Sequence, residues 1–143
     1  MWEIRVRKLH PDAQIPTRGS EEAACWDVYS LENVPTPLNE EVLRVRTGLS
    51  LEVPKGYFLD IRPRSGLSKY YRIANSPGTL DSDYRGELII LLEKRSPMEV
   101  HQVRKGDRVA QVRLEKVLEV EWLEVIDLTP TIRGEGGFGS TGD

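Results

Sequence analysis

The feature of this sequence that most restricts its fold is a series of short segments in which roughly every second residue is apolar. Turn-forming residues separate these segments, as in VPKG at 53–56 and RKGD at 104–107. Side chains alternate between the two faces of a β-strand, so the pattern predicts strands with one buried face. The expected strands cover residues 4–9, 42–45, 49–53, 57–61, 88–92, 98–103, 109–117 and 120–126.

Helical periodicity is weak throughout the chain. No stretch of ten or more residues has an apolar stripe at helical spacing, and the best helical candidate is one short piece at 65–71. Several short strands at close spacing, without helical crossovers, predict an all-β protein. We therefore expect a jelly-roll-like antiparallel β-barrel or sandwich with one short helix.

The length of 143 residues fits a single domain with one core. We expect residues 1–132 to form the β domain, because no linker, repeat or low-complexity segment interrupts them. Residues 133–143 differ: RGEGGFGSTGD contains five glycines and one large apolar residue, Phe138. Such a segment cannot hold itself folded, so we expect a flexible C-terminal arm of the same domain that is either free or docked.

Charge and composition exclude several classes of partner. The formal net charge of −3 creates no field that would gather nucleic acid or an anionic membrane. The charged start, MWEIRVRKLH, has no signal-peptide run, and no stretch approaches the roughly 20 apolar residues of a membrane span, so we expect a cytoplasmic protein. One cysteine, Cys25, and two histidines argue against a disulfide or a zinc centre. A small anionic ligand would have to be held by local arginines and backbone amides.

Two segments have the composition of anion-binding loops. The glycines of the tail let backbone N–H groups approach an anion, and Arg133 adds a planar cation suited to phosphate. In PRSGLS (63–68), a turn before a short helix can aim Arg64, the Ser65 hydroxyl and backbone N–H groups at phosphate oxygens. The alternatives are a frayed C-terminus and an ordinary turn in which Ser65 caps the helix.

A third segment, GTLDSDYRGEL (78–88), places two carboxylates beside an aromatic residue. A regular strand would put Asp81 and Tyr84 on opposite faces. If both face one pocket, the backbone must bend near Ser82, and this bend is a structural prediction. The alternative is an exposed charged turn in which Asp81 and Asp83 pair with Arg85.

Five ordered segments together resemble the trimeric dUTPase family. They are AACWDVYS (23–30), PRSGLS, GTLDSDYRG (78–86), GDRVAQV (106–112) and RGEGGFGSTG (133–142), and they span nearly the whole chain. Each segment is a weak signal alone. The first departs from the family's Ala-Gly-x-Asp-Leu pattern, because Cys25 and Trp26 replace the usual Gly and Tyr. A Gly there could serve a left-handed turn that a Cys would strain.

The resemblance implies a catalytic role for Asp81, which would hold and activate the attacking water. It implies that Tyr84 packs under the deoxyribose and leaves no room for a 2′-hydroxyl. It also implies that Asn75, in a rigid hairpin that includes Thr79, hydrogen-bonds the uracil edge. As an alternative, Asn75 is a turn residue, and both interpretations can hold at once.

The resemblance also assigns residues to the phosphates and the base. Gln111 would bind the phosphate chain, although a buried amide on an apolar strand could instead make only a cross-strand hydrogen bond. Phe138 would stack over the uracil. Mg²⁺ would be held mainly by phosphates and waters, with Asp27 acting only through water. The full set implied for substrate binding is Arg64, Ser65, Gly66, Asn75, Thr79, Tyr84, Gln111, Arg133, Phe138, Gly139, Ser140 and Thr141.

As a member of this family the chain would be a Mg²⁺-dependent homotrimer with sites shared between subunits. It would hydrolyse dUTP to dUMP and pyrophosphate by water attack on the α-phosphate, which keeps uracil out of DNA and supplies dUMP for dTMP synthesis. One alternative is a dCTP deaminase, or a bifunctional deaminase and dUTPase of the same fold. The other is a binding protein on the same trimer that senses nucleotide without turnover.

Overall fold

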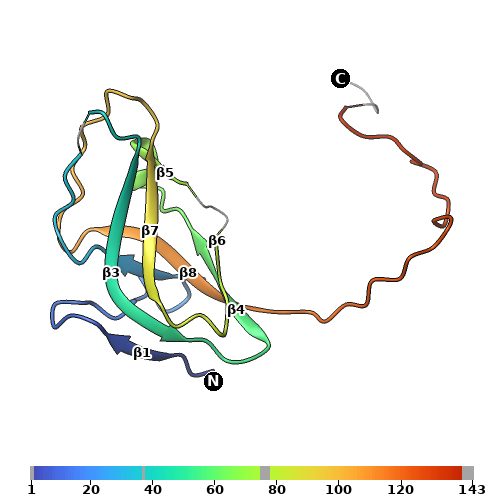
Figure 1. Ribbon diagram of the computed structural model, residues 1–143, viewed down its shortest axis with the longest axis horizontal. Coiled ribbons are helices and arrows are strands. Elements are labelled where there is room, and N and C mark those ends of the chain that lie inside the picture. Colours follow the sequence, from blue (N-terminus) through green and yellow to red (C-terminus); the bar gives the residue numbers. More distant parts are fainter. Residues whose placement is uncertain (1, 37, 75–77, 140–143) are drawn as a thin grey trace.

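The computed structural model describes residues 2–36, 38–74 and 78–139. Within these ranges, eight strands form two antiparallel sheets that pack face to face (Figure 1). Sheet A has the order β1-β3-β7-β5, with β1 (Arg5–Lys8), β3 (Val42–Glu52), β5 (Tyr71–Ile73) and β7 (Glu87–Lys94). Sheet B has the order β2-β8-β4-β6, with β2 (Trp26–Tyr29), β4 (Tyr57–Arg62), β6 (Gly78–Leu80) and β8 (Arg108–Lys116).

These two sheets confirm the predicted all-β antiparallel class, in the form of a sandwich rather than a closed barrel. The one helical element in the described residues is a 3₁₀ turn, Leu67–Lys69, which lies inside the predicted 65–71 segment. The described part of the chain contains no helix with the length and apolar character needed to cross a bilayer. The cytoplasmic location stays a prediction.

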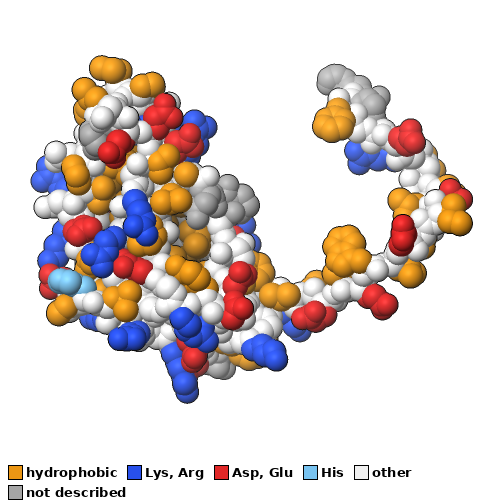
Figure 2. Space-filling view, viewed as in Figure 1, with side chains coloured by type: hydrophobic (Ala, Val, Ile, Leu, Met, Phe, Trp, Pro, Cys, Tyr) orange, Lys and Arg blue, Asp and Glu red, His pale blue; other side chains and the backbone are white. Residues whose placement is uncertain are grey.

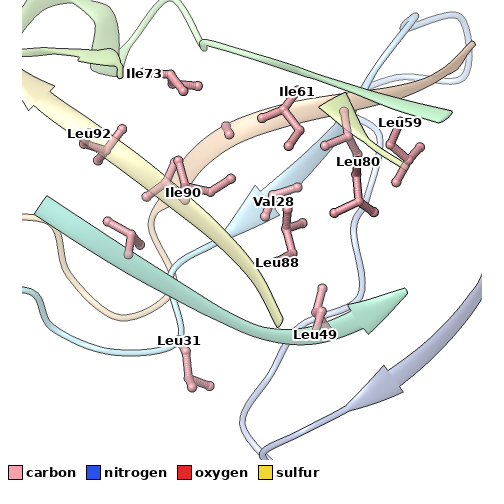
Figure 3. Close-up of a cluster of buried hydrophobic side chains, with 14 of the residues drawn as sticks. Val28, Leu31, Leu49, Leu59, Ile61, Ile73, Leu80, Leu88, Ile90 and Leu92 are labelled. Atoms are coloured by element: carbon pink, nitrogen blue, oxygen red, sulfur yellow. The ribbon is translucent and has the colours of Figure 1, made fainter. Parts of the chain in front are cut away.

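The core lies between the sheets and follows from the period-two pattern. Along β7, Leu88, Ile90 and Leu92 are at most 2% exposed, while the residues between them are only partly buried. Figure 3 shows these side chains on the same side of β7 as Val28 of β2 and Ile61 of β4. Each such burial stabilises the fold by about 1.5–3 kcal/mol, so the alternation selects which face packs inward.

Gly48 joins two predicted strands into one. Residues 42–45 and 49–53 were expected as separate strands, but β3 runs continuously through both, with a register shift against β7 between Arg46 and Ser50. Gly48 has φ 71°, and a Cβ at this position would lie 2.9 Å from the Cβ of Ala13. A glycine therefore makes the bulge possible without breaking the strand.

The predicted strand at 98–103 is wrong. Only Val103 pairs there, in an isolated bridge. The carboxylate of Glu99 accepts the next two backbone N–H groups, at 3.1 and 2.8 Å, and the Tyr71 hydroxyl donates to the carbonyl of His101. Side chains thus satisfy the backbone groups that a strand ladder would have used, and the segment becomes a loop.

The predicted strand at 120–126 is also wrong. Figure 1 shows this segment running away from both sheets, and Trp122 and Ile126 are 92% and 99% exposed. Its backbone therefore has no neighbouring strand within one chain to pair with. Three observed strands, β2, β5 and β6, were not predicted from the alternating pattern. They contain only three or four residues, too few to display an alternation.

The chain leaves the sandwich where β8 ends at Lys116 (Figure 1). Beyond it, large apolar side chains such as Leu118, Leu128 and Ile132 are at least 75% exposed, and Figure 2 shows apolar groups spaced along this extension. The extended segment thus starts well before residue 133. The functional division of the chain at 132/133 stays a prediction.

Candidate active site

The outer face of sheet B carries the strand-borne members of the predicted site. Asp27 of β2 and Gln111 of β8 are cross-strand partners, and Gln111 also lies opposite Arg62 of β4. Two residues from Arg62 along β4, Asp60 lies opposite Thr79 of β6. Each of these five residues is next in sequence to a buried core residue, such as Val28 beside Asp27 or Ile61 beside Arg62. Because side chains alternate along a strand, the five side chains point away from the core.

A pair of arginines converges on Asp27. The Nε of Arg64 lies 2.8 Å from Oδ1 of Asp27, and the Nε of Arg108 lies 3.9 Å from Oδ2. The side chain of Asp27 is only 11% exposed and that of Arg64 is 27% exposed. A shielded carboxylate therefore fixes the orientation of Arg64 before any ligand arrives.

The loop that follows β4 is held by Gln111. Its Nε2 donates to the carbonyl of Pro63 at 2.9 Å, and the Ser68 hydroxyl donates to the carbonyl of Ser65 at 2.7 Å. The N-cap position of the 3₁₀ turn is Gly66, and no side chain caps it, so the alternative in which Ser65 serves as a cap is wrong. Gln111 does make a structural hydrogen bond, which fits the alternative raised from the sequence. The same bond sets the loop's position beside β8.

The bend predicted near Ser82 is present. The backbone N–H of Tyr84 donates to the carbonyl of Asp81 at 3.2 Å, and Ser82 and Asp83 form the turn between them. Asp81 directly follows β6, and both Asp81 and Tyr84 are exposed. The turn therefore removes the strand geometry that would have separated the two side chains.

Arg85 ties this turn to sheet A. Its Nη1 donates to the carbonyl of Ser82 at 2.7 Å, and its Nη2 lies 3.3 Å from Oε1 of Glu52 on β3. The Ser50 hydroxyl donates to the carbonyl of Arg85 at 2.5 Å. Arg85 thus pairs with Glu52 rather than with the aspartates of its own turn. From the sequence, Arg85 has a role only in the alternative of an exposed charged turn, although its place in the third segment was a signal for this supporting role.

The arm is not gathered with the rest of the predicted site. Arg133 donates from Nε to the carbonyl of Gly136 at 2.6 Å, which forms a local turn. Phe138 has φ 49° and is fully exposed, and Gly139 has φ 82°. Three further predicted site residues, Asn75, Ser140 and Thr141, lie outside the described residues.

The two halves of the predicted site lie far apart in one chain. Asp81 follows β6 at one edge of sheet B, and Asp27 lies on β2 at the other edge, three strand spacings away. Followed across the sheet, the strand register aligns Asp81 with Phe58 of β4 and Asp27 with Arg62 of β4. These two positions are four residues apart along β4. With about 4.8 Å between strands and about 3.3 Å per residue, the backbones are separated by about 20 Å.

The two halves of the predicted site also line separate surface hollows. One, of about 820 Å³, is lined by Asp81, Asp83 and Arg85 among others. Another, of about 420 Å³, is lined by Arg64, Gly66, Arg108 and their neighbours. Each hollow therefore holds part of the predicted chemistry.

Comparison with known proteins decides the family. A family model described as dUTPase matches residues 11–142. This chain belongs to the dUTPase family. The chain is 44% identical over 142 residues to a deoxyuridine 5′-triphosphate nucleotidohydrolase of Nautilia profundicola, and the match covers 98% of this chain and 99% of the relative.

Solved dUTPase structures share the fold. A mutant dUTPase of phage 80alpha superposes with a TM-score of 0.81 and 26% identity, over 96% of this chain and 98% of that one. The Staphylococcus bacteriophage 80alpha dUTPase with dUPNHPP superposes with a TM-score of 0.77 and 27% identity, over 99% of both chains.

The departures from the dUTPase first motif do not require a left-handed backbone at Cys25. Among the described residues, Phe138 is the one non-glycine residue with positive φ, so Cys25 is in a conformation open to any residue. Trp26 packs against Arg18, whose Cζ lies 4.9 Å from the ring centroid. Asp27 lies in register with Gln111, and the pairing of β2 with β8 shifts only further along, between Val28 and Tyr29. Cys25 is therefore accommodated without positive φ, next to a strand that pairs Asp27 with Gln111.

Arg108 is a site residue that the sequence reasoning missed in this dUTPase chain. It opens β8 inside the fourth motif, and its Nε is nearest to Oδ2 of Asp27, whereas Arg64 is nearest to Oδ1. The sequence feature that could have indicated this role for Arg108 was its place at the start of a predicted strand region, directly after Asp107. In the described residues, no group of three or more His, Cys, Asp or Glu side chains is placed to hold a metal ion.

Proposed function

We propose that this chain hydrolyses dUTP to dUMP and pyrophosphate by in-line attack of water on the α-phosphorus. The observation that carries the proposal is the turn that joins Asp81 to Tyr84, found in a chain of the dUTPase family. The activity would keep uracil out of DNA and supply dUMP for dTMP synthesis. The known dUTPase with bound dUPNHPP supports a site for the same nucleotide here.

Asp81 is the proposed general base. Its exposed carboxylate lines the 820 Å³ hollow, where water and substrate can reach it. The water oxygen bonds to the α-phosphorus, the bond from that phosphorus to the bridging oxygen breaks, and the water proton passes to Asp81. Pyrophosphate leaves with the electrons of the broken bond. Holding the water in line supplies much of the rate, because it replaces a random encounter with a fixed geometry.

Phosphate binding is proposed for Arg64, Ser65, Gly66 and Gln111. Asp27 engages Arg64 through Nε, so the two Nη nitrogens can serve phosphate oxygens. Arg133 on the arm would add a further cation, together with Ser140 and Thr141. Closing the arm over the phosphates would exclude water and strengthen each of these charge contacts.

Selection of the nucleoside is proposed for the β6 region and the arm. Tyr84 would lie beneath the deoxyribose and exclude a 2′-hydroxyl, while Asn75 and Thr79 belong to the hairpin that holds uracil. Phe138, with Gly139 beside it, would stack over the base.

Mg²⁺ is the proposed cofactor, bound mainly by the substrate phosphates and by waters. Asp27 suits an indirect role, because Oδ1 is taken by Arg64 while Oδ2 has Arg108 only at 3.9 Å and can accept a hydrogen bond from a metal-bound water. When bound, the ion would offset phosphate charge.

A homotrimer is proposed from the resemblance to the trimeric dUTPases, and the separation of the half-sites supports a site shared between copies. Asp81 and Asp27 lie at opposite edges of sheet B, about 20 Å apart, which is too far for both halves to act on one small nucleotide. A rotation that repeats three times brings the β6 edge of one copy beside the β2 edge of the next and closes the ring. The extended segment that leads from β8 to the arm, with Trp122 and Ile126 almost fully exposed, fits contact with a further copy.

One assay separates the proposed activity from its alternatives. Purified protein is incubated with Mg²⁺ and either dUTP or dCTP, and pyrophosphate and ammonia are followed. Pyrophosphate from dUTP, with no product from dCTP, supports the proposal. Ammonia from dCTP would support the deaminase or the bifunctional form, and nucleotide binding without either product would support the binding protein.

A further inference from the structure

The loop from Pro63 to Tyr70 carries residues that are proposed to bind phosphate, and we call it the phosphate loop. Gln111 of β8 holds its start through the carbonyl of Pro63. Arg95, which follows β7, holds its end. The backbone N–H of Arg95 donates to the carbonyl of Tyr70 at 3.0 Å, and its Nε donates to the carbonyl of Ser68. Protein contacts therefore fix both ends of the loop, with the proposed phosphate ligands between them.

A histidine that the sequence did not single out covers the end of the phosphate loop. The ring of His101 stacks on the ring of Tyr70, with centroids 3.9 Å apart and an angle of 5° between the ring planes. Both side chains are half-buried, and both line the hollow of about 420 Å³ that also contains Arg64 and Arg108. The stacked pair is therefore part of the wall of the phosphate half-site.

The backbone of His101 is itself held in place. Its N–H donates to Oε1 of Glu99 at 2.8 Å, and its carbonyl accepts a hydrogen bond from the Tyr71 hydroxyl. Tyr71 belongs to β5 and is 1% exposed, so this second bond ties His101 to a buried part of sheet A. The contacts that make a loop of residues 98–103 thus give the imidazole a rigid support over Tyr70.

We propose that His101 is a positioning residue for dUTP hydrolysis. Its ring, stacked on Tyr70, holds the end of the phosphate loop so that Arg64 and Gly66 meet the phosphate chain in a fixed geometry. This inference rests on the proposed function. A loop that is already ordered loses little conformational freedom on binding, so loss of the stack would weaken the bound substrate and the transition state alike. A uniform loss of this kind raises KM and leaves kcat unchanged.

The geometry of the stack supplies the variants that test it. The contact uses the face of the imidazole, and a phenyl ring presents a similar face but has no N–H group. His101→Phe therefore keeps the stack and removes any hydrogen bond that the imidazole could make to substrate, whereas His101→Ala removes both. Gln102→Ala, at the exposed neighbouring position, is the matched control.

The test measures kcat and KM of the full chain for dUTP with Mg²⁺, with circular dichroism as the check on folding. His101→Ala is expected to raise KM by about 3–10-fold, which is the scale of an aromatic pair, with kcat within about twofold of wild type. His101→Phe should restore KM to within about twofold of wild type, and Gln102→Ala should not change it. An unchanged KM in His101→Ala would overturn the inference. A KM in His101→Phe as high as in His101→Ala would also overturn it, because the imidazole nitrogens would then contact the substrate directly.

A second variant removes the other ring of the stack. Tyr70→Leu should raise KM in the same direction, and the double variant with His101→Ala should raise it no further, because both changes remove one contact. If His101→Ala fails to fold, an unchanged KM in Tyr70→Leu overturns the inference. A wild type without dUTP hydrolysis would overturn the proposed function itself, which separates that failure from an active enzyme that is indifferent to the stack.

Discussion

The ring of Tyr84 lies directly against the backbone of Gly86. A Cβ built at position 86 would lie 2.6 Å from Cζ of Tyr84, closer than real Cβ contacts come. The Tyr84 hydroxyl then donates to the carbonyl of Glu87 at 2.9 Å. Glycine at position 86 thus leaves the space in which the tyrosine ring is fixed.

Gly86→Ala should displace the Tyr84 ring while preserving the fold, because Gly86 does not need positive φ. We expect kcat/KM for dUTP to fall by about 10–100-fold and the preference for dUTP over UTP to shrink. Steady-state kinetics with both nucleotides measure this. Gly19→Ala, where no heavy atom lies within 4 Å, is the control. An unchanged dUTP to UTP ratio would show that the ring position does not govern sugar selection.

Asp81→Ala should lower kcat by about 10²–10⁴-fold while dUTP still binds, because the carboxylate acts on the water rather than on the nucleotide. Pyrophosphate release and equilibrium binding of dUTP are the two measurements. Asp83→Ala changes the neighbouring carboxylate of the same hollow and should leave kcat within a few-fold of wild type. Near-normal turnover in Asp81→Ala would remove the proposed mechanism.

Arg64→Ala should raise KM for dUTP and also destabilise the fold by about 1–3 kcal/mol, since it leaves the shielded Asp27 carboxylate without its nearest partner. Urea unfolding measures the second effect. In a cycle with Asp27→Asn, the double variant should be less destabilised than the sum of the single variants. Strictly additive losses would mean that the 2.8 Å pair contributes no coupling.

Burial raises the pKa of Tyr71 to about 12, and the nearby charge of Glu99 adds to the shift. The unfolded pKa is about 10, so Tyr71 stabilises the fold fully below pH 10, and this contribution is lost as the pH rises through 12. Its upper limit is about 3 kcal/mol, from about 1.4 kcal/mol per pKa unit. Unfolding free energies of wild type and Tyr71→Phe between pH 8 and 12 should therefore converge as the pH rises. Parallel curves would contradict the shift.

Removal of residues 133–143 should lower kcat/KM for dUTP by about 100-fold or more, because the arm supplies Arg133 and Phe138 to the closed site. Circular dichroism and the number of subunits, from molecular mass, should match those of the full chain, since the described part of the arm contributes no residue to the core. An unaffected rate would identify the arm as a frayed end.

Much of the fold could be predicted from local pattern. The alternation that marks Leu88, Ile90 and Leu92 is a direct consequence of burying one face of a strand, and it identified β7 correctly. The same alternation misled at 98–103, where Glu99 and Tyr71 bind the backbone, and at 120–126, where no neighbouring strand exists within one chain. An alternation with a period of two indicates which side chains could share one face of a strand. It does not indicate which other strand will pair with that strand.

The candidate site, like the fold, was predictable from the sequence only in part. The sequence by itself determined the fold class, the residue types of the five segments and the need for a bend between Asp81 and Tyr84, because these depend on short-range spacing. Tertiary structure alone decided that Arg108 joins Arg64 at Asp27, that Gly86 accommodates Tyr84, and that the half-sites lie about 20 Å apart. Those relationships follow from strand order and register, which are fixed by contacts between residues distant in the chain.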